Sequence, residues 1–264
     1  MILERKSALV TGGTTGLGRA IAERFLGAGA RAVITGRDAN IGGEAEAELR
    51  EHGEVHFVRA DAADEAAITA SVDRTIELLG GLDVLVNNAG IGVISTILET
   101  PATDFDRVMA VNLRGYYLYA KAAFPHLRER GGCMIHVSSD AGVLGEVDIG
   151  VYSVSKAAVI MLSNMLALEC GRAGVRSNCI CPGDIIPGMR HMAPPGEEGR
   201  QEDDPAEWNL PPIGRLGQAR DVAEAALFLA SDASSFCNGA NLLVDGGMRA
   251  GYNADRPERP AGID

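Results

Sequence analysis

The sequence predicts an α/β protein built on one doubly wound parallel sheet, with helices covering both faces. Two observations support this prediction. Short apolar runs alternate with helix-length amphipathic segments, and a glycine-rich turn follows the first apolar run. Uninterrupted apolar strands joined by helices are typical of parallel sheets that are buried on both sides. The length of 264 residues suits one large domain of this kind.

Seven segments have the length and composition of buried strands: Ser7–Val10, Ala32–Thr35, Val55–Val58, Val84–Val86, Met134–Val137, Val175–Ile180 and Asn241–Val244. Helices are expected between them, at about Leu17–Ala28, Ile41–His52, Asp64–Leu79, Thr103–Leu127, Tyr152–Cys170 and Asp221–Ala230. Glycines follow the first and third helices, as is common at helix ends. This order of elements predicts a single Rossmann-like domain over residues 1–264.

The alternation of strands and helices breaks between Asp184 and Arg215. That stretch contains six of the eleven prolines and the only tryptophan, Trp208. A long irregular excursion from a compact domain is typical of a lid over a functional site. We therefore expect residues 184–215 to form a substrate lid. Residues 248–264 are polar, and we expect a C-terminal tail on the surface or at a subunit contact.

The composition excludes several classes of protein. The chain has 36 acidic residues and 24 Lys and Arg, a formal charge of −12, so no nucleic-acid partner is expected. No run approaches the ~20 apolar residues that span a membrane, and no signal segment is visible, so a cytoplasmic location is expected. The five cysteines form neither a disulfide framework nor a zinc-binding spacing, so no metal site is expected.

The segment Thr11–Gly18 lies directly between the first predicted strand and the first predicted helix and contains four glycines. Glycines allow the backbone to approach a ligand closely, and the following helix presents free N–H groups to a phosphate. This position predicts binding of a dinucleotide pyrophosphate. The spacing is not G-x-G-x-x-G, and it lacks the Gly-Lys-Ser/Thr ending of an ATP-binding P-loop.

The spacing Thr-Gly-x-x-x-Gly-x-Gly resembles the cofactor loop of the short-chain dehydrogenase/reductase family. Other motifs of that family follow in the expected order: Asp61 after the third strand, Asn87-Asn88-Ala89-Gly90 after the fourth, Pro182-Gly183 after the sixth, and Asp245-Gly246-Gly247 near the end. The resemblance covers about Ser7 to Met248. It implies an NAD(P)-dependent oxidoreductase that acts on CH–OH groups, with a Tyr-x-x-x-Lys pair on a helix.

Two such pairs are present, Tyr117-Lys121 and Tyr152-Lys156, although chance predicts roughly 0.06 of them in this composition. Tyr152 lies in the helix that follows the fifth strand, and Ser138 and Ser139 end that strand. Ligands of doubly wound sheets bind at the carboxyl ends of the strands, which favours Tyr152-Lys156 as the catalytic pair. Tyr117 has no such neighbour and is interpreted as packing against another helix or subunit.

The resemblance also assigns the remaining catalytic positions. The family's spacing of thirteen residues before the tyrosine selects Ser139, and Ser138 is expected to hydrogen-bond the backbone. Asn112, in the long fourth helix, matches a further catalytic position, where it would anchor a water that relays protons. An Asn within a helix is mildly unfavourable, which supports a role for it.

A mechanism follows from charge. Reduction of a ketone leaves an alkoxide that needs a proton donor, so Tyr152 is expected to act as general acid in reduction and as base in oxidation. A neighbouring ammonium and an oxidised nicotinamide both favour the phenolate, so we expect a lowered pKa for Tyr152. Lys156 would lower it and, as the family implies, hold the nicotinamide ribose. Ser139 would orient the substrate oxygen.

The cofactor is expected to be NADP rather than NAD. Gly36 stands where NAD-preferring relatives carry Asp, and Arg37 follows it, where it can pair with a 2′-phosphate. Thr15 is not basic, so no second cation is expected. Pro187 stands where relatives carry a Thr that contacts the carboxamide, and proline offers neither hydroxyl nor N–H. Cofactor contacts are predicted for Gly12, Thr14, Gly16, Leu17, Gly18, Arg37, Asp61, Ala62, Asn88, Ala89, Gly90, Tyr152, Lys156, Pro182, Gly183 and Ile185.

The substrate class remains open at this stage. A neutral secondary alcohol or ketone is favoured, because the predicted lid mixes apolar residues with carboxylates. A 3-ketoacyl thioester on an acyl carrier protein is an alternative, with Arg128, Arg130 and Arg172 as a possible dock. An epimerase or dehydratase using transient oxidation, and a cofactor-binding regulator without turnover, are further alternatives. The family resemblance implies a homo-oligomer, most often a tetramer.

Overall fold

The computed structural model describes residues 1–186 and 210–251. Its centre is a seven-stranded sheet in the order β3-β2-β1-β4-β5-β6-β9, in which every pairing is parallel. The strands are β1 (Ser7–Val10), β2 (Arg31–Gly36), β3 (Val55–Arg59), β4 (Val84–Asn87), β5 (Cys133–Val137), β6 (Arg176–Pro182) and β9 (Asn241–Val244). All seven predicted strands are present, and the predicted fold class is confirmed.

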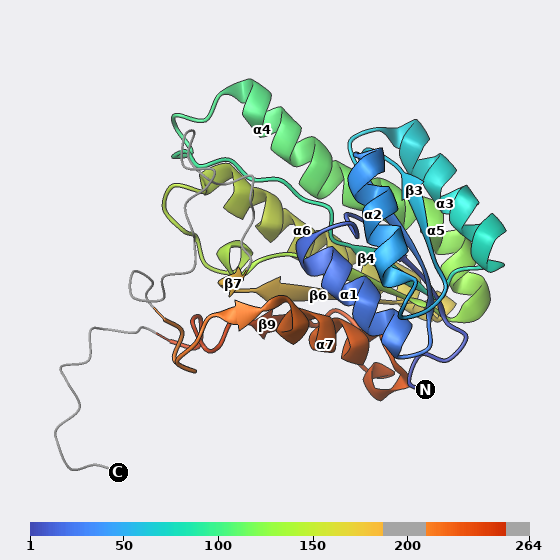
Figure 1. Ribbon diagram of the computed structural model, residues 1–264. Coiled ribbons are helices and arrows are strands. Elements are labelled where there is room, and N and C mark those ends of the chain that lie inside the picture. Colours follow the sequence, from blue (N-terminus) through green and yellow to red (C-terminus); the bar gives the residue numbers. More distant parts are fainter. Residues whose placement is uncertain (187–209, 252–264) are drawn as a thin grey trace, which may run out of the picture.

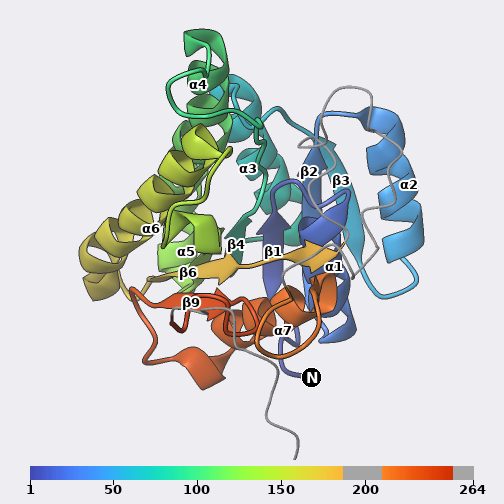
Figure 2. The same cartoon turned by 90° about the vertical axis from the view of Figure 1, so that its left-hand side faces the viewer.

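Helices cover both faces of this sheet (Figures 1 and 2). One face carries α1 (Gly16–Gly27), α2 (Ala39–Leu49) and α7 (Ala219–Ala230), and the other carries α3 (Glu65–Leu79), α4 (Ala102–Met109), α5 (Gly115–Arg130) and α6 (Gly150–Cys170). The sheet therefore lies between two helical layers. The central strands β1, β4 and β5 are buried along their whole length because helices cover both of their sides, whereas the edge strands β3 and β9 are partly exposed.

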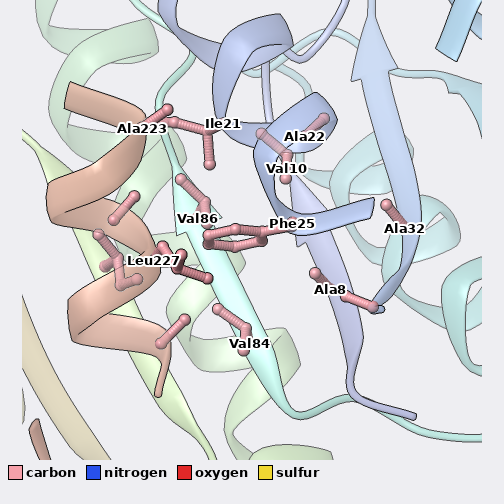
Figure 3. Packing of buried hydrophobic residues seen from close by; sticks show 14 of the residues in the cluster. Ala8, Val10, Ile21, Ala22, Phe25, Ala32, Val84, Val86, Ala223 and Leu227 are labelled. Carbon is pink, nitrogen blue, oxygen red and sulfur yellow. The ribbon is translucent and has the colours of Figure 1, made fainter. Parts of the chain in front are cut away.

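The alternation of side chains along β1 shows how each strand serves both layers. Ala8 and Val10 point to the first layer, whereas Leu9 points to the second. In the first layer Phe25 of α1 packs among Val84 and Val86 of β4 and Leu227 of α7 (Figure 3). Phe25 is fully buried, so it fixes the position of α1 and of the loop that precedes it.

The predicted long helix is interrupted. After α4 the chain makes a π-helical turn over Ala110–Arg114 and then continues as α5. A π-helical turn inside a helix is rare and often occurs at functional sites. Asn112 lies in this turn. The prediction of one regular helix over Thr103–Leu127 was therefore wrong, since helical periodicity does not reveal a change of hydrogen-bond register.

Helix α6 is apolar along much of its length. The stretch Gly150–Ala173 is long and apolar enough to cross a membrane by length and composition alone. Helices in the cores of globular proteins meet the same criterion. Here α6 packs on the sheet with Val151 and Val159 buried, and it also carries buried Lys156. We therefore interpret α6 as a core helix.

The predicted lid is only partly described. Its first residues form β7 (Ile185–Ile186), which pairs in parallel with β8 (Gly217–Gln218), just beyond the end of the predicted lid. The two ends of the segment therefore lie together beside the carboxyl end of β6. Pro187 and Trp208 lie outside the described residues.

The strand order determines where a ligand can bind. The chain moves outward from β1 to β3 and then returns to place β4 on the other side of β1. Ligands of doubly wound sheets bind at such a reversal, beside the carboxyl ends of the strands. The loops after β1, β4, β5 and β6 all begin at that edge, and they contain the predicted site residues.

Candidate active site

The loop after β1 is tied directly to the loop after β4. The Thr11 hydroxyl oxygen accepts hydrogen bonds from the backbone N–H groups of Asn88 (2.9 Å) and Ala89 (3.1 Å). The Asn88 side chain donates to the carbonyl oxygens of Thr11 (3.0 Å) and Gly12 (3.2 Å). These bonds fix the loop over the reversal point. Thr11 was not among the predicted contacts, although a hydroxyl at a strand end is a signal that could have revealed it.

Glycine is needed in this loop for close approach. A Cβ on Gly18 would collide with the Gly12 carbonyl oxygen and the Asn88 amide, and a Cβ on Gly12 would lie 2.9 Å from the Ala89 Cα. Gly12 also has a φ of +63°, which L side chains rarely adopt. The loop can therefore pack this tightly only without side chains at these two positions.

The amino terminus of α1 is open. Its N-cap residue, Thr15, makes no side-chain capping bond, and the first turn holds no acidic residue. No heavy atom lies within 4 Å of the point where a Cβ on Gly16 would stand. Free N–H groups, the positive end of the helix dipole and empty space together fit a pyrophosphate. Leu17 instead packs against the core below and positions the helix.

The edge of the site beside β2 carries two cations. Arg37 follows β2 and is exposed, and the Nε of Arg59 donates to the Arg37 carbonyl oxygen (2.9 Å). Sequence reasoning expected no second cation because it considered only Thr15. Arg59 pairs in register with Gly36 across the parallel strands, so the strand order β3-β2-β1 could have revealed it. A Cβ on Gly36 would lie 2.8 Å from the Thr14 side chain, so the two residues pack closely.

The other predicted cofactor residues line the same edge. Asp61 lies after β3, half-buried, where its carboxylate accepts from Ala63 N–H (2.9 Å), and the adjacent Ala62 is buried. Pro182 ends β6 and Ile185 is half-buried in β7. The N–H of Gly183 donates to the Val244 carbonyl oxygen (3.1 Å), which ties this loop to β9.

The two serines after β5 have different surroundings. Ser138 Oγ donates to the backbone carbonyl oxygen of Lys156 (2.7 Å), which is the backbone bond expected for it. Ser139 begins a short 3₁₀ turn, where its Oγ accepts from Ala141 N–H (3.2 Å) and donates to the Asp140 carboxylate (3.2 Å). Ser139 also lies close enough to the phenol of Tyr152 to lower the pKa of that group. The structure therefore brings Ser139, and not Ser138, to the tyrosine.

Tyr152 and Lys156 lie on one face of α6, and both are buried. The Lys156 ammonium donates to the Val137 carbonyl oxygen (2.8 Å) and lies 5.5 Å from the ring centroids of both Tyr152 and Tyr116. Tyr116 donates to the same carbonyl oxygen (3.2 Å), so it helps to hold the lysine. An ammonium has three donors, and this contact uses one of them. The sequence did not predict Tyr116 as a site residue, because no lysine lies four residues after it.

Burial changes the pKa values of this pair. The pKa of Tyr152 is raised to about 12, chiefly by burial, with smaller contributions from the nearby Ser139 hydroxyl, which lowers it, and from the carboxylates of Asp140 and Glu146, which raise it. Burial also lowers the pKa of Lys156 to about 8. The expected lowering of the Tyr152 pKa is therefore wrong for the protein alone, since desolvation of a phenolate outweighs the neighbouring ammonium.

Asn112 uses its side chain to hold the chain after β4. Its Oδ1 accepts from the Ile91 N–H (2.9 Å), and its Nδ2 donates to the Ile91 carbonyl (2.8 Å) and to Ser155 Oγ (3.0 Å). Both amide protons are occupied. Gly90 lies between this residue and the lysine, since a Cβ there would be 3.5 Å from both Asn112 Oδ1 and Lys156 Nζ. The side chain of Asn112 thus positions the loop that borders the tyrosine site.

The second tyrosine–lysine pair lies on the surface. Tyr117 is 47% exposed and Lys121 is exposed. Tyr117 borders a shallow surface hollow with Met109 and Leu162, away from any strand end. The structure therefore separates it from the predicted site.

A doubly wound sheet with an open phosphate loop and a buried Ser–Tyr–Lys set at the same edge defines a nicotinamide-dependent oxidoreductase. Comparison with known proteins gives the family. Residues 12–249 match the family model described as enoyl-(acyl carrier protein) reductase, and the chain belongs to the short-chain dehydrogenase/reductase family. The resemblance inferred from the motifs is confirmed, as is an enzyme that acts on CH–OH groups.

Individual relatives cover nearly the whole chain. The NADP-dependent (R)-specific alcohol dehydrogenase of Lentilactobacillus kefiri is 36% identical over 94% of this chain and 98% of its own length. The L-fucose dehydrogenase of Mus musculus is 40% identical over 94% and 89%. The crystal structure of levodione reductase superposes with a TM-score of 0.87 at 32% identity, covering 95% of this chain and 100% of that one.

Proposed function

We propose that this protein interconverts a neutral secondary alcohol and the corresponding ketone, with Tyr152 as general acid and base and NADP as the preferred cofactor. The observation that carries the proposal is the convergence of Ser139, Tyr152 and Lys156 at the sheet edge that also holds the open phosphate loop. Bound nicotinamide supplies or accepts the hydride, which this chain's own residues cannot do.

The residues of the chain then handle the proton and the orientation. With a pKa of about 12, the Tyr152 phenol is protonated at neutral pH and can donate to the oxygen of a reduced ketone. Ser139, whose hydroxyl lies beside that phenol, orients the same oxygen. Lys156 keeps its charge below about pH 8 and has donors free for a cofactor hydroxyl. Asn112 acts through the Ile91 backbone and is a positioning residue; a relayed water at this position stays a prediction.

The preference for NADP is supported by the two arginines at the end of β2 and β3. Arg37 and Arg59 are exposed side by side, and Gly36 supplies no carboxylate to repel a 2′-phosphate. Replacing both arginines by Ser should raise KM for NADPH about tenfold and change KM for NADH less than twofold, because only NADPH carries the phosphate. Equal effects on both cofactors would contradict the assignment. A single Arg50→Ser variant, which replaces the exposed arginine directly after α2, serves as the control.

A neutral substrate is supported by the charge beside Tyr152. Asp140, Glu146 and Asp184 lie close together there, and the pKa values of Glu146 and Asp184 are raised by burial and by the neighbouring carboxylates. Such a site disfavours anionic substrates. This observation favours the alcohol over the alternative, a ketoacyl thioester on an acidic carrier protein.

The decisive experiment is a screen of secondary alcohols and ketones with both nicotinamides, followed by absorbance of the reduced cofactor. Stoichiometric cofactor turnover with neutral alcohols supports the proposal. Product formed without net cofactor change would indicate the epimerase or dehydratase, and activity restricted to carrier-bound thioesters would indicate the acyl reductase. Cofactor binding without any turnover would indicate a regulator.

A homotetramer is supported by two separate apolar surfaces. The first surface lies on α4, α5 and α6, and its exposed apolar side chains are Phe105, Tyr117, Met161, Met165 and Leu168. The second lies around α7 and β9, and its exposed apolar side chains are Phe228, Phe236 and Leu243. Two self-complementary surfaces are what a tetramer with dihedral symmetry requires. Light scattering of the purified protein tests this, and a monomer would refute it. The cytoplasmic location stays a prediction.

A further inference from the structure

The short segment after β9 places a largely buried arginine at the edge of the active site. The side chain of Arg249 is only 16% exposed. Its Nε lies 3.0 Å from the Asp140 carboxylate, and its Nη2 lies 3.2 Å from the Glu146 carboxylate. Asp140 directly follows Ser139, so the contact joins two segments that are more than 100 residues apart in the sequence.

Hydrogen bonds within the turn that precedes Arg249 fix the position of this residue. The Asp245 carboxylate accepts hydrogen bonds from the N–H groups of Gly247 (2.9 Å) and Arg249 (2.8 Å). Gly183, which directly follows β6, packs against Asp245, since a Cβ on Gly183 would lie 2.9 Å from the Asp245 Cα. The family motifs Pro-Gly and Asp-Gly-Gly therefore meet in space and set the direction in which Arg249 leaves β9.

Asp140 connects this arginine to the reacting groups. The Ser139 hydroxyl donates to Asp140 Oδ1 (3.2 Å), while Arg249 pairs with the other oxygen, Oδ2. One oxygen of the Asp140 carboxylate thus accepts a hydrogen bond from the serine hydroxyl, and the other oxygen pairs with the guanidinium of Arg249. A carboxylate held in this way fixes which direction the serine lone pairs face.

The charged and titratable groups around Tyr152 come from several elements. Lys156 lies on the same helix, Tyr116 faces it from α5, and Asp140 and Glu146 face it from the segment between β5 and α6. Asp184, after β6, faces Asp140 and Arg249. Among the described residues that the structure places around Asp140 and Glu146, Arg249 is the cation paired with both carboxylates.

We propose that Arg249 is a positioning residue: it holds Asp140 against the Ser139 hydroxyl and neutralises the carboxylates beside Tyr152, so that the segment after β9 completes the active site. This inference rests on the proposed function of Tyr152 as acid and base. It assigns the electrostatic setting of that tyrosine to a residue that acts through Asp140 and Glu146.

The test compares the two members of the ion pair. The kcat for alcohol oxidation is measured against pH at saturating alcohol and oxidised cofactor, since this profile reports the enzyme–substrate complex. Arg249→Gln leaves the carboxylates unbalanced and should move the midpoint of the rising limb upward by about one pH unit. Asp140→Asn removes a negative charge and should move it downward by a similar amount.

The double variant Asp140→Asn/Arg249→Gln should return the midpoint to within about 0.5 unit of the wild type, because the two charges act through each other. Arg249→Lys keeps the charge and should restore most of the profile. Arg24→Gln, which breaks the exposed pair of Arg24 with Glu224 between α1 and α7, is the matched control and should leave the profile unchanged.

Opposite shifts of the midpoint would establish the role. Shifts in the same direction, or lower activity with an unmoved midpoint, would overturn it and reduce the pair to a structural contact. If Arg249→Gln does not fold, Asp140→Asn and the double variant decide alone. The outcome is separate from that of the proposed function, which is tested by the substrate screen and by the turnover of Tyr152→Phe.

Discussion

Two regions at the same edge of the sheet are built in opposite ways. The phosphate-loop region, Thr11–Gly18 with Asn88–Gly90, relies on backbone groups, glycines and an open helix terminus, and it contains no ionisable side chain; the half-buried Arg19 lies just beyond it. The tyrosine region, Ser139, Asp140, Tyr152, Lys156 and Arg249, contains four buried or largely buried ionisable groups. In the proposed function, the first region binds the pyrophosphate of the cofactor and the second transfers a proton.

The two regions differ because binding a pyrophosphate and transferring a proton have different electrostatic requirements. A pyrophosphate keeps its charge throughout, so fixed N–H dipoles are sufficient to bind it. A proton donor must change its charge during the reaction, so its pKa has to be set by burial and by neighbouring charges. The pKa of Tyr152 is raised to about 12 and that of Lys156 is lowered to about 8 by the same burial.

The largest expected effect comes from removing the proton donor. Tyr152→Phe should lower turnover by at least ~10²-fold, because no other group is placed to exchange the proton. Cofactor binding, measured by fluorescence titration, should remain within about threefold, since the phosphate-loop region is untouched. Turnover close to that of the wild type would contradict the role of Tyr152.

A smaller effect, on binding rather than chemistry, is expected from Gly18→Ala. The added methyl group would collide with the Gly12 carbonyl oxygen and the Asn88 amide. Overpacking of this kind costs about 1–3 kcal/mol, so the cofactor Kd should rise about tenfold while kcat at saturation falls less. Gly27→Ala, at the other end of α1 with nothing within 4 Å of the new Cβ, is the control and should bind normally.

The two regions should also differ in their response to pH. The kcat/KM for ketone reduction should be constant below about pH 8 and fall by about tenfold per pH unit above it, as Lys156 loses its proton. Binding of ADP, which lacks the nicotinamide half of the cofactor and does not reach Lys156, should be constant from pH 7 to 9. A Lys156→Arg variant keeps its charge, so the fall near pH 8 should disappear. Persistence of that fall would assign it to another group.

The smallest effect is expected from the second tyrosine. Tyr117→Phe removes a hydroxyl from a half-exposed ring on α5, far from the strand ends, and should change kcat by less than about twofold. Loss of turnover comparable to that of Tyr152→Phe would mean that the two tyrosines had been assigned to the wrong roles.

The sequence predicted the features that depend on residues close together along the chain, such as buried strands and the glycine-rich loop. The apolar runs predicted all seven strands, because the central strands β1, β4 and β5 are buried along their whole length and the other strands also contain apolar residues. The phosphate loop was also visible, since its function requires glycines at fixed spacing between a strand and a helix. Choosing Tyr152 over Tyr117 needed only the serine at the end of the preceding strand.

Other features could not be found in this way. The π-helical turn at Asn112 leaves the apolar periodicity almost unchanged, so a regular helix was predicted there. The second cation, Arg59, follows only from the order of strands, which places β3 beside β2. The raised pKa of Tyr152 depends on how deeply α6 packs, and a sequence does not record depth.

The sequence by itself therefore determined the class of fold, the phosphate loop and the identity of the tyrosine, because each depends on neighbours within a few residues. Only the tertiary structure decided the electrostatic setting of that tyrosine. The Arg249–Asp140 pair joins positions that are distant along the chain and meet because β5, β6 and β9 are adjacent in the sheet. Charges act through space, and the fold alone specifies which charges are near one another.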